Sequence, residues 1–294
     1  MPSWKKENQN LKDFKVYKGI LPMREYSNDD LKLFEDIKNG RTFDAQSEMP
    51  DIYRKNLLNL LWMQADSEYA GGLGYMPWIA KAPNAHERVL VAQIVKDEMR
   101  HAHVIYKILD DLGEKTHDHM LAHEFDWRIP DDMANIGFTR AKKDKRVNIF
   151  YYPITHWEDF CLFNFLMDRA AGHVLEDTLN SSYLPWKNAI GTICKEEHMH
   201  LAHGDKTVKE MAKDPVKKAF LQARLDLWWP RVMNTFGKSS GNGNDIYQKL
   251  GLKNRSNAEV RTAFVKEITE KCAEWGLKVP EYNEALQPNE YSFQ

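Results

Sequence analysis

The hydrophobic residues of this chain recur at spacings of three and four from about residue 52 onward, which is the period of an amphipathic helix. No convincing alternation of apolar and polar residues, the pattern of a half-buried strand, follows. Proline and glycine residues divide the apolar pattern into separate segments. The predicted helices cover about 52–70, 84–113, 155–180, 186–212, 215–230 and 256–275. The chain is therefore predicted to be all-α.

The segments before and between these helices are polar or rich in turn-forming residues. Residues 1–50 are irregular in pattern and are interpreted as an arm that lies over the core or a partner, ahead of one domain at 51–294. The glycines within 71–74 are expected to loosen the end of the first helix. The stretch 113–153 is interpreted as a long crossover connection, and the Gly/Asn/Ser-rich stretch 237–244 as a surface loop. These elements favour a ferritin-like four-helix bundle with additional C-terminal helices.

Two of the predicted helices carry a glutamate and a histidine one turn apart inside the apolar stripe. Glu98 and His101 share the apolar face of the second helix, and Glu197 and His200 share that of the fourth. Residues at i and i+3 lie on one face of a helix, so each pair can hold one metal ion. A third Glu-x-x-His, at 114–117, follows a helix-ending glycine and is interpreted as surface loop.

A ferritin-like site also takes one acid from each of the other two helices. Glu68 continues the apolar stripe of the first helix and precedes Glu98 by 30 residues (98 − 68). Asp168 lies on the apolar stripe of the third helix and precedes Glu197 by 29 residues (197 − 168). Such near-equal offsets are expected of two helix hairpins related by a pseudo-twofold axis. Glu68 and Asp168 are therefore the predicted lone acids.

The predicted metal site combines four carboxylates with two imidazoles: Glu68, Glu98, His101, Asp168, Glu197 and His200. Burying four carboxylates without compensation is prohibitively costly, whereas two divalent ions neutralise them. Oxygen and imidazole ligands without a thiolate favour iron or manganese over copper or structural zinc. The alternative is a set of satisfied core ion pairs, for which the same phasing would be a coincidence.

Two further acids, Asp97 and Glu196, each directly precede a predicted ligand glutamate. A metal-bound imidazole generally donates its second N–H to a carboxylate. We hypothesise that each acid orients the histidine of the opposite motif, the alternative being that both are solvated helix acids. Residues 97–101 resemble the Asp-Glu-x-Arg-His motif of bacterial multicomponent monooxygenases, in which such an arrangement occurs.

Composition argues against several other classes of protein. Lys and Arg total 41 against 43 for Asp and Glu, a formal net charge of −2, which disfavours a nucleic-acid partner. The three cysteines form no Cys-x-x-Cys pair, which suits a reducing cytoplasm. The absence of a signal region and of an apolar run of roughly 18 residues predicts no membrane association. The absence of flavin and nicotinamide motifs predicts that neither cofactor is bound by this chain.

From about Met49 to the last predicted helix, the sequence resembles the catalytic subunit of phenylacetyl-CoA epoxidase and, more distantly, the benzoyl-CoA epoxidase oxygenase. The likeness is carried by the segments 49–55, 67–68, 78–83, 97–98, 150–153, 193–197 with His200, and 228–230. The metal ligands of the family match the six residues given above. The resemblance implies a di-iron oxygenase that uses O2 and external electrons to epoxidise an aromatic ring carried as a CoA thioester.

The resemblance also implies partners and substrate-binding residues. Electrons would come from a separate reductase, and the chain would associate with a non-catalytic ferritin-like subunit or with further copies of itself. Lys145 matches the thioester-binding lysine of the family, and Lys253 matches a phosphate-binding lysine. Asn59 and Met63 stand where relatives use Arg and Gln to contact the ligand, so the acyl group and the CoA carrier stay open.

Other functions are compatible with the predicted metal site. One is a di-iron hydroxylase that acts on a substrate without CoA, and another is a ferritin-like protein that handles iron or peroxide. Storage proteins are typically shorter bundles, whereas the arm, crossover and C-terminal helices suit a large substrate. A purely structural subunit would be expected to lack metal ligands, and all six are present.

Overall fold

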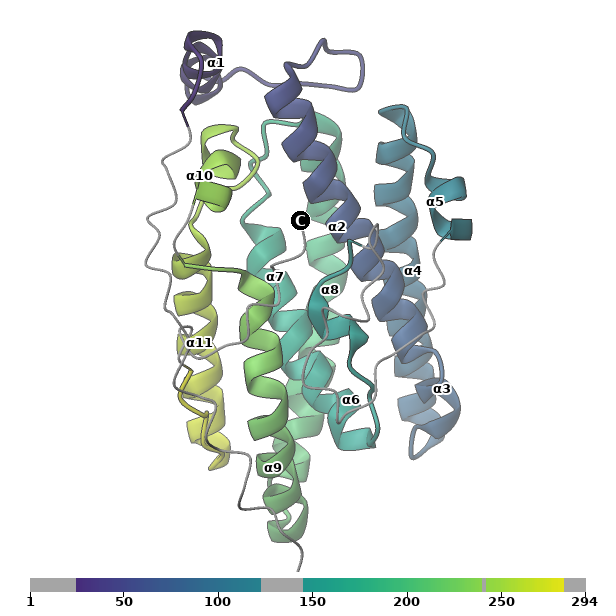
Figure 1. The fold of residues 1–294 in the computed structure, drawn as a ribbon. Coiled ribbons are helices and arrows are strands. Elements are labelled where there is room, and N and C mark those ends of the chain that lie inside the picture. The colour runs from purple at the N-terminus through teal and green to yellow at the C-terminus, as the bar shows by residue number, and fades with distance from the viewer. Residues whose placement is uncertain (1–24, 123–144, 240–241, 283–294) are drawn as a thin grey trace, which may run out of the picture.

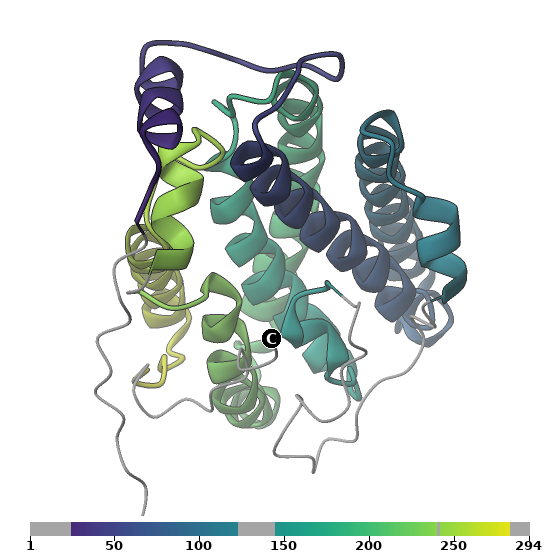
Figure 2. The same ribbon diagram turned by 45° about the horizontal axis from the view of Figure 1, so that its top comes forward.

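The computed structural model describes residues 25–122, 145–239 and 242–282, and within these ranges the regular structure is helical apart from a bridge between Phe43 and Tyr183. The long helices run alongside one another in both views (Figure 1 and Figure 2). The helical elements are α1 (Asn28–Lys38), α2 (Asp51–Tyr75), α3 (Trp78–Lys81), α4 (Ala85–Asp111), α5 (Thr116–Ala122), η3 (Asn148–Tyr151), α6 (Trp157–Phe163), η4 (Asn164–Asp168), α7 (Arg169–Glu176), α8 (Leu184–Met211), α9 (Pro215–Met233), η5 (Asn234–Phe236), α10 (Asn242–Lys249) and α11 (Asn257–Trp275).

Four helical segments form the central bundle: α2, α4, α8 and the continuous run α6–η4–α7. Helix α2 packs along α4, and α8 packs along α6, η4 and α7 (Figure 1). Helices α9 and α11 pack against the α6–η4–α7 side of this bundle, and α1 contacts α10 at one end. The predicted fold class, an all-α ferritin-like bundle with additional C-terminal helices, is therefore confirmed.

Local sequence signals explain where the two long Glu-x-x-His helices begin and end. The side chain of Asn84 caps α4 by accepting a hydrogen bond from the Glu87 N–H at 2.9 Å. Helix α4 ends just before Gly113, whose φ of +82° is a left-handed conformation that glycine adopts without strain. Pro185 stands in the first turn of α8, where its missing N–H leaves no helical hydrogen bond unmade.

A layer of buried polar residues separates two hydrophobic clusters in the core. Along α2, one cluster ends at Ala65 and the other begins at Ala70. Along α4 the order is reversed, with one cluster ending at Val95 and the other beginning at Ala102. Buried acids and a histidine occupy the intervening turns of both helices. The fold therefore places its chemistry between two apolar layers that keep water away from it.

Helix α2 extends beyond its predicted end near residue 70 and stops only at Tyr75. The expectation that its glycines loosen the helix was wrong, because they permit close packing instead. A Cβ on Gly71 would lie 3.2 Å from Glu98 Oε2, and a Cβ on Gly72 would lie 2.8 Å from Met99 Cε. Small residues here let α4 approach α2 at the level of the buried acids.

The arm contains a helix where the sequence pattern had indicated irregular structure. Helix α1 begins at a capping box in which the Ser27 hydroxyl accepts from the Asp30 N–H, and it buries Leu33 and Ile37. The irregular interpretation was therefore wrong for this part of the arm, and residues 1–24 lie outside the described ranges.

Three connecting regions also differ in detail from the sequence predictions. Helix α5 lies within the predicted crossover, of which residues 123–144 are outside the described ranges. Helix α9 continues through Pro230 to Met233, and α10 begins at Asn242 inside the stretch interpreted as a surface loop. The predicted third helix contains the π-helical turn η4. Among the described residues, no helix has the length and apolar run that a membrane crossing requires.

Candidate metal centre

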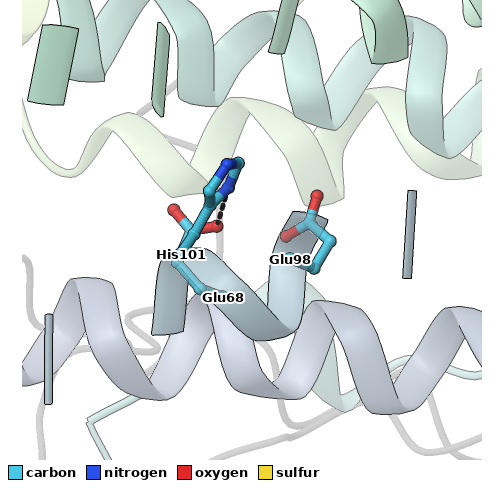
Figure 3. A group of neighbouring side chains, drawn as sticks. All are labelled: Glu68, Glu98 and His101. Carbon is cyan, nitrogen blue, oxygen red and sulfur yellow. Dashed lines mark ion pairs between the residues drawn. The ribbon is translucent and has the colours of Figure 1, made fainter. Parts of the chain in front are cut away.

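Five of the six predicted ligands converge in the buried polar layer. Glu68 comes from α2, Glu98 and His101 from α4, and Glu197 and His200 from α8, and all five are buried. Figure 3 shows Glu68, Glu98 and His101 pointing into the same space from two neighbouring helices. The five residues form two groups that share Glu98, and in each group the potential ligand atoms lie within 4.8 Å of one another. Each group could hold a metal ion.

The Nδ1 atoms of the two histidines face the carboxylates. His101 Nδ1 lies 3.4 Å from Glu68 Oε2 and 3.2 Å from Glu197 Oε1. His200 Nδ1 lies 3.3 Å from Glu98 Oε1 and 3.1 Å from Glu197 Oε2. Glu197 therefore approaches both imidazoles, one with each oxygen atom.

The sixth predicted ligand, Asp168, lies beside these groups without joining either one. It ends the π-helical turn η4 and is buried. The Tyr75 hydroxyl donates to Asp168 Oδ1 at 2.8 Å, and the Asn164 side-chain amide donates to Oδ2, also at 2.8 Å. Burial raises the pKa of Asp168 to about 7, with the positive charge of His200 opposing that shift and the charge of Glu197 adding to it. Asp168 thus interacts electrostatically with Glu197 and His200 of α8.

The buried carboxylates and imidazoles of the site shift one another's pKa values. Burial raises the pKa of Glu98 well above its usual value, and the neighbouring Glu197 and Glu68 add to that rise against the hydrogen bond to His200. Burial alone would lower the pKa of His101, yet the Glu197 and Glu68 carboxylates raise it to about 10. Four buried carboxylates surrounded by apolar clusters are costly unless positive charge compensates them.

The surroundings of His101 Nδ1 indicate whether the residues present fit a metal ion. His101 Nδ1 is buried and makes no well-formed hydrogen bond with any residue that the structure describes, although it faces two carboxylates. A buried imidazole nitrogen left in this way normally costs stability. A metal ion shared with those carboxylates would satisfy it, and oxygen and imidazole donors together suit iron or manganese. The residues present therefore fit the metal pair that the sequence predicts.

The outer nitrogens of the two histidines meet acids of the opposite helix. His101 Nε2 donates to Glu196 Oε2 at 2.8 Å, and Glu196 also pairs with Arg100. His200 Nε2 lies 3.7 Å from Asp97 Oδ2, whose carboxylate accepts from Gln93 at 2.8 Å. The structure thus places each acid beside the histidine of the other motif. The hydrogen bond from His101 Nε2 to Glu196 leaves Nδ1 of that ring as the nitrogen available to a metal.

The two lysines with predicted substrate roles lie in separate surroundings. Lys145 is exposed, and its backbone N–H donates to Asp66 at 3.2 Å. The Lys253 ammonium lies 5.8 Å from the ring centroid of Tyr247, and burial lowers its pKa. The Tyr247 hydroxyl accepts from the Asn59 side-chain amide at 2.7 Å, so Tyr247 lies beside both Lys253 and Asn59, a position expected to differ from the family.

Sequence reasoning did not assign roles to the partners that hold these side chains. Tyr75 stands seven residues after Glu68, close to two turns along α2, but the helix had been predicted to end before it. Asn164 precedes Asp168 by four residues, and Gln93 precedes Asp97 by four. An amide one turn before an acid on a buried helical face is a signal that could have found both.

An all-α bundle that buries carboxylates on four helical segments, two of which also carry an imidazole one turn away, defines a ferritin-like protein of the carboxylate-histidine class. Within that class, the chain belongs to the phenylacetic acid catabolic protein family, whose model matches residues 23–292. It is similar to one of the subunits of 1,2-phenylacetyl-CoA epoxidase from Escherichia coli (strain K12), with 29% identity over 257 residues that cover 83% of this chain and 75% of that protein. The family resemblance inferred from sequence is confirmed.

Proposed function

We propose that this chain is a di-iron oxygenase that epoxidises the aromatic ring of an acyl-CoA thioester. The observation that carries the proposal is the pair of buried ligand groups sharing Glu98, with His101 Nδ1 and His200 Nδ1 each facing two carboxylates. Membership of the phenylacetic acid catabolic protein family and the similarity to part of an epoxidase support it.

Two irons would be held by six residues, Glu68, Glu98, His101, Asp168, Glu197 and His200. When bound, the metal pair would supply the reduction of O2 and the transfer of one oxygen atom to the substrate. The chain supplies the rest. Glu196 holds the outer nitrogen of His101, which leaves Nδ1 directed inward, and the two hydrophobic clusters keep bulk water from the site.

The proposed substrate class, an acyl-CoA thioester, rests on the similarity to an epoxidase subunit and on the surroundings of Lys253. The similar protein is named for phenylacetyl-CoA, a thioester with an anionic carrier. Lys253, beside Tyr247 and Asn59, would contact a phosphate of the carrier, and Lys145 would contact the thioester. Because the Asn59 amide already donates to Tyr247, we expect the acyl or carrier contacts here to differ from those of the relatives.

Partner proteins form part of the proposal. The similar protein is one subunit of an epoxidase, and this chain carries no flavin or nicotinamide motif. Electrons would therefore come from a separate reductase, and further subunits or copies of this chain would complete the assembly.

The test is a single-turnover reaction with matched histidine variants. The protein is loaded anaerobically with Fe(II), reduced chemically, and exposed to O2 with a panel of aryl-CoA thioesters, and products are identified by mass spectrometry. We expect two irons per chain and an epoxide from at least one thioester. His117→Ala, at the exposed histidine of the third Glu-x-x-His, should behave as the wild type, whereas His101→Ala should lose iron and product.

The outcomes separate the competing functions. Two bound irons without product from any thioester would reject acyl-CoA epoxidation and leave the metal site standing. Oxidation of iron far beyond two per chain would favour an iron-handling protein. Normal iron binding by His101→Ala or Glu197→Ala would reject the site assignment itself.

A further inference from the structure

A chain of buried hydrogen bonds leads from the metal centre toward the surface. Asp168 Oδ2 accepts from the Asn164 amide at 2.8 Å, and Asn164 Oδ1 lies 3.0 Å from His203 Nδ1. His203 Nε2 in turn lies 2.8 Å from Glu87 Oε2. Asn164, Asp168 and His203 are all buried, and Glu87 is partly exposed. The proposed mechanism uses only one of these four residues, Asp168.

The backbone brings His203 and Asn164 together by an unusually close approach. Gly204 of α8 packs directly on the π-helical turn, since a Cβ at this position would lie 2.6 Å from Phe165 N and 2.8 Å from Asn164 C. The neighbouring His203 is thereby set against the Asn164 side chain. π-Helical turns occur frequently at functional sites, and here the turn contains both Asn164 and Asp168.

The polarity of the hydrogen bonds shows what His203 does. An amide has one face that donates and one that accepts, so Asn164 can donate to the Asp168 carboxylate only while its carbonyl faces His203. The Asn164 carbonyl and the Glu87 carboxylate can only accept, so the His203 ring, as the imidazolium, donates Nδ1–H to the first and Nε2–H to the second. Without this donor, the Asn164 amide is free to turn its oxygen toward the carboxylate, which would repel Asp168.

Asp168 acts on one of the two ligand groups. Its turn η4 packs on α8, the helix that supplies Glu197 and His200 to the Glu98, Glu197 and His200 group. We propose that His203 is a positioning residue that, through Asn164, holds the Asp168 carboxylate for the metal ion of the Glu98, Glu197 and His200 group. The inference rests on the proposed function, because it requires the two-metal site. It predicts that His203 affects one ion and leaves the other unchanged.

The test is a Co(II) titration of the full chain, followed by absorption spectroscopy and metal analysis, with no turnover required. In His203→Phe the ring volume is retained and the Nδ1–H donor is lost. We expect the wild type to bind two ions, and His203→Phe to bind the second about 10- to 100-fold more weakly while the first is unchanged. His203→Gln, which keeps an amide donor, should restore most of the affinity.

A matched control exists on α7. His173 Nε2 pairs with Glu267 at 2.9 Å, much as His203 pairs with Glu87, and His173→Phe should leave both ions unaffected. If His203→Phe fails to fold, as judged by circular dichroism, Asn164→Leu removes the same relay at similar volume and should give the same selective loss.

Each result decides the question. Unchanged binding in the folded variant, or equal weakening of both ions, would overturn the positioning role and leave the proposed function intact. A wild-type chain that binds fewer than two Co(II) ions would instead overturn the proposed function, and this inference with it.

Discussion

Substitution of Gly204 by alanine should destabilise the protein, although alanine is the better helix former. The glycine lies within α8, where φ is helical, so backbone strain is not the reason for its presence. An alanine Cβ would lie 2.6 Å from Phe165 N, 2.7 Å from Phe165 Cα and 2.8 Å from Asn164 C. These are backbone atoms of a buried helical turn, which cannot rotate away as a flexible side chain can.

The expected magnitude follows from two opposing effects. Replacing glycine by alanine inside a helix contributes about 1 kcal/mol of stability. Normal carbon contacts lie at about 3.5–4.0 Å, so the π-helical turn would have to move by about 1 Å, and forcing an extra methyl group into a packed core costs roughly 1–3 kcal/mol or more. Because the clash involves three backbone atoms, we expect the upper part of that range, and a net loss of about 1–2 kcal/mol.

Gly191→Ala is the matched control, because this glycine lies in the same helix and a Cβ there would meet nothing within 4 Å. Chemical unfolding should show a gain of up to about 1 kcal/mol for Gly191→Ala and a loss for Gly204→Ala. The Co(II) titration should also show weaker binding of the second ion in Gly204→Ala, since Asn164 and Asp168 would move. Equal stability of the two variants would refute the reasoning from close approach.

Three further predictions test other parts of the structure. Gly72→Ala should cost less stability than Gly204→Ala in the same unfolding assay, because its Cβ would meet the mobile end of Met99. Tyr75→Phe removes one of the two hydrogen bonds to the Asp168 carboxylate, and should lower the unfolding free energy by about 1–2 kcal/mol and weaken binding of the second Co(II) ion. Asp159 is subject to burial, which alone would raise its pKa, but hydrogen bonds from Arg224, Trp228 and Thr155 hold that pKa below its usual value of 3.8. The stability that Asp159 contributes is therefore complete above about pH 4 and is lost as the pH falls through the lowered pKa. In urea unfolding, the wild type should lose stability over this acid range, and Asp159→Asn should lose less.

Much of the fold could be predicted because its long helices are amphipathic. The predicted limits of the second, fourth and last helices agree with α4, α8 and α11 to within about two residues, since Asn84, Gly113 and Ser256 supply recognised helix boundaries. The end of α2 was missed because single-sequence reasoning treats glycine as a helix breaker. Its close contact with Glu98 and Met99 exists only after α2 and α4 have packed.

The candidate site was predictable where its residues lie on regular α-helices, in which the angle between successive residues is constant. Glu98, His101, Glu197 and His200 lie on regular helices, where i and i+3 share a face, and the structure brings them together. Asp168 was also placed by phase, but it ends a π-helical turn, in which the angle between successive residues is not that of an α-helix. Its carboxylate faces Tyr75 and Asn164, partners that depend on the packed arrangement of several helices.

The two halves of the site are related in sequence but differ in their surroundings. The side chain of Glu196, which holds His101, is 31% exposed and shares its charge with Arg100. Asp97, which faces His200, is only 5% exposed and is held by Gln93. The equal spacing of the motifs therefore aligns the ligands without making their environments equal. His101 Nε2 donates to a partly exposed acid, whereas His200 Nε2 lies 3.7 Å from a buried one, so two bound ions would experience different local fields even with matched ligands.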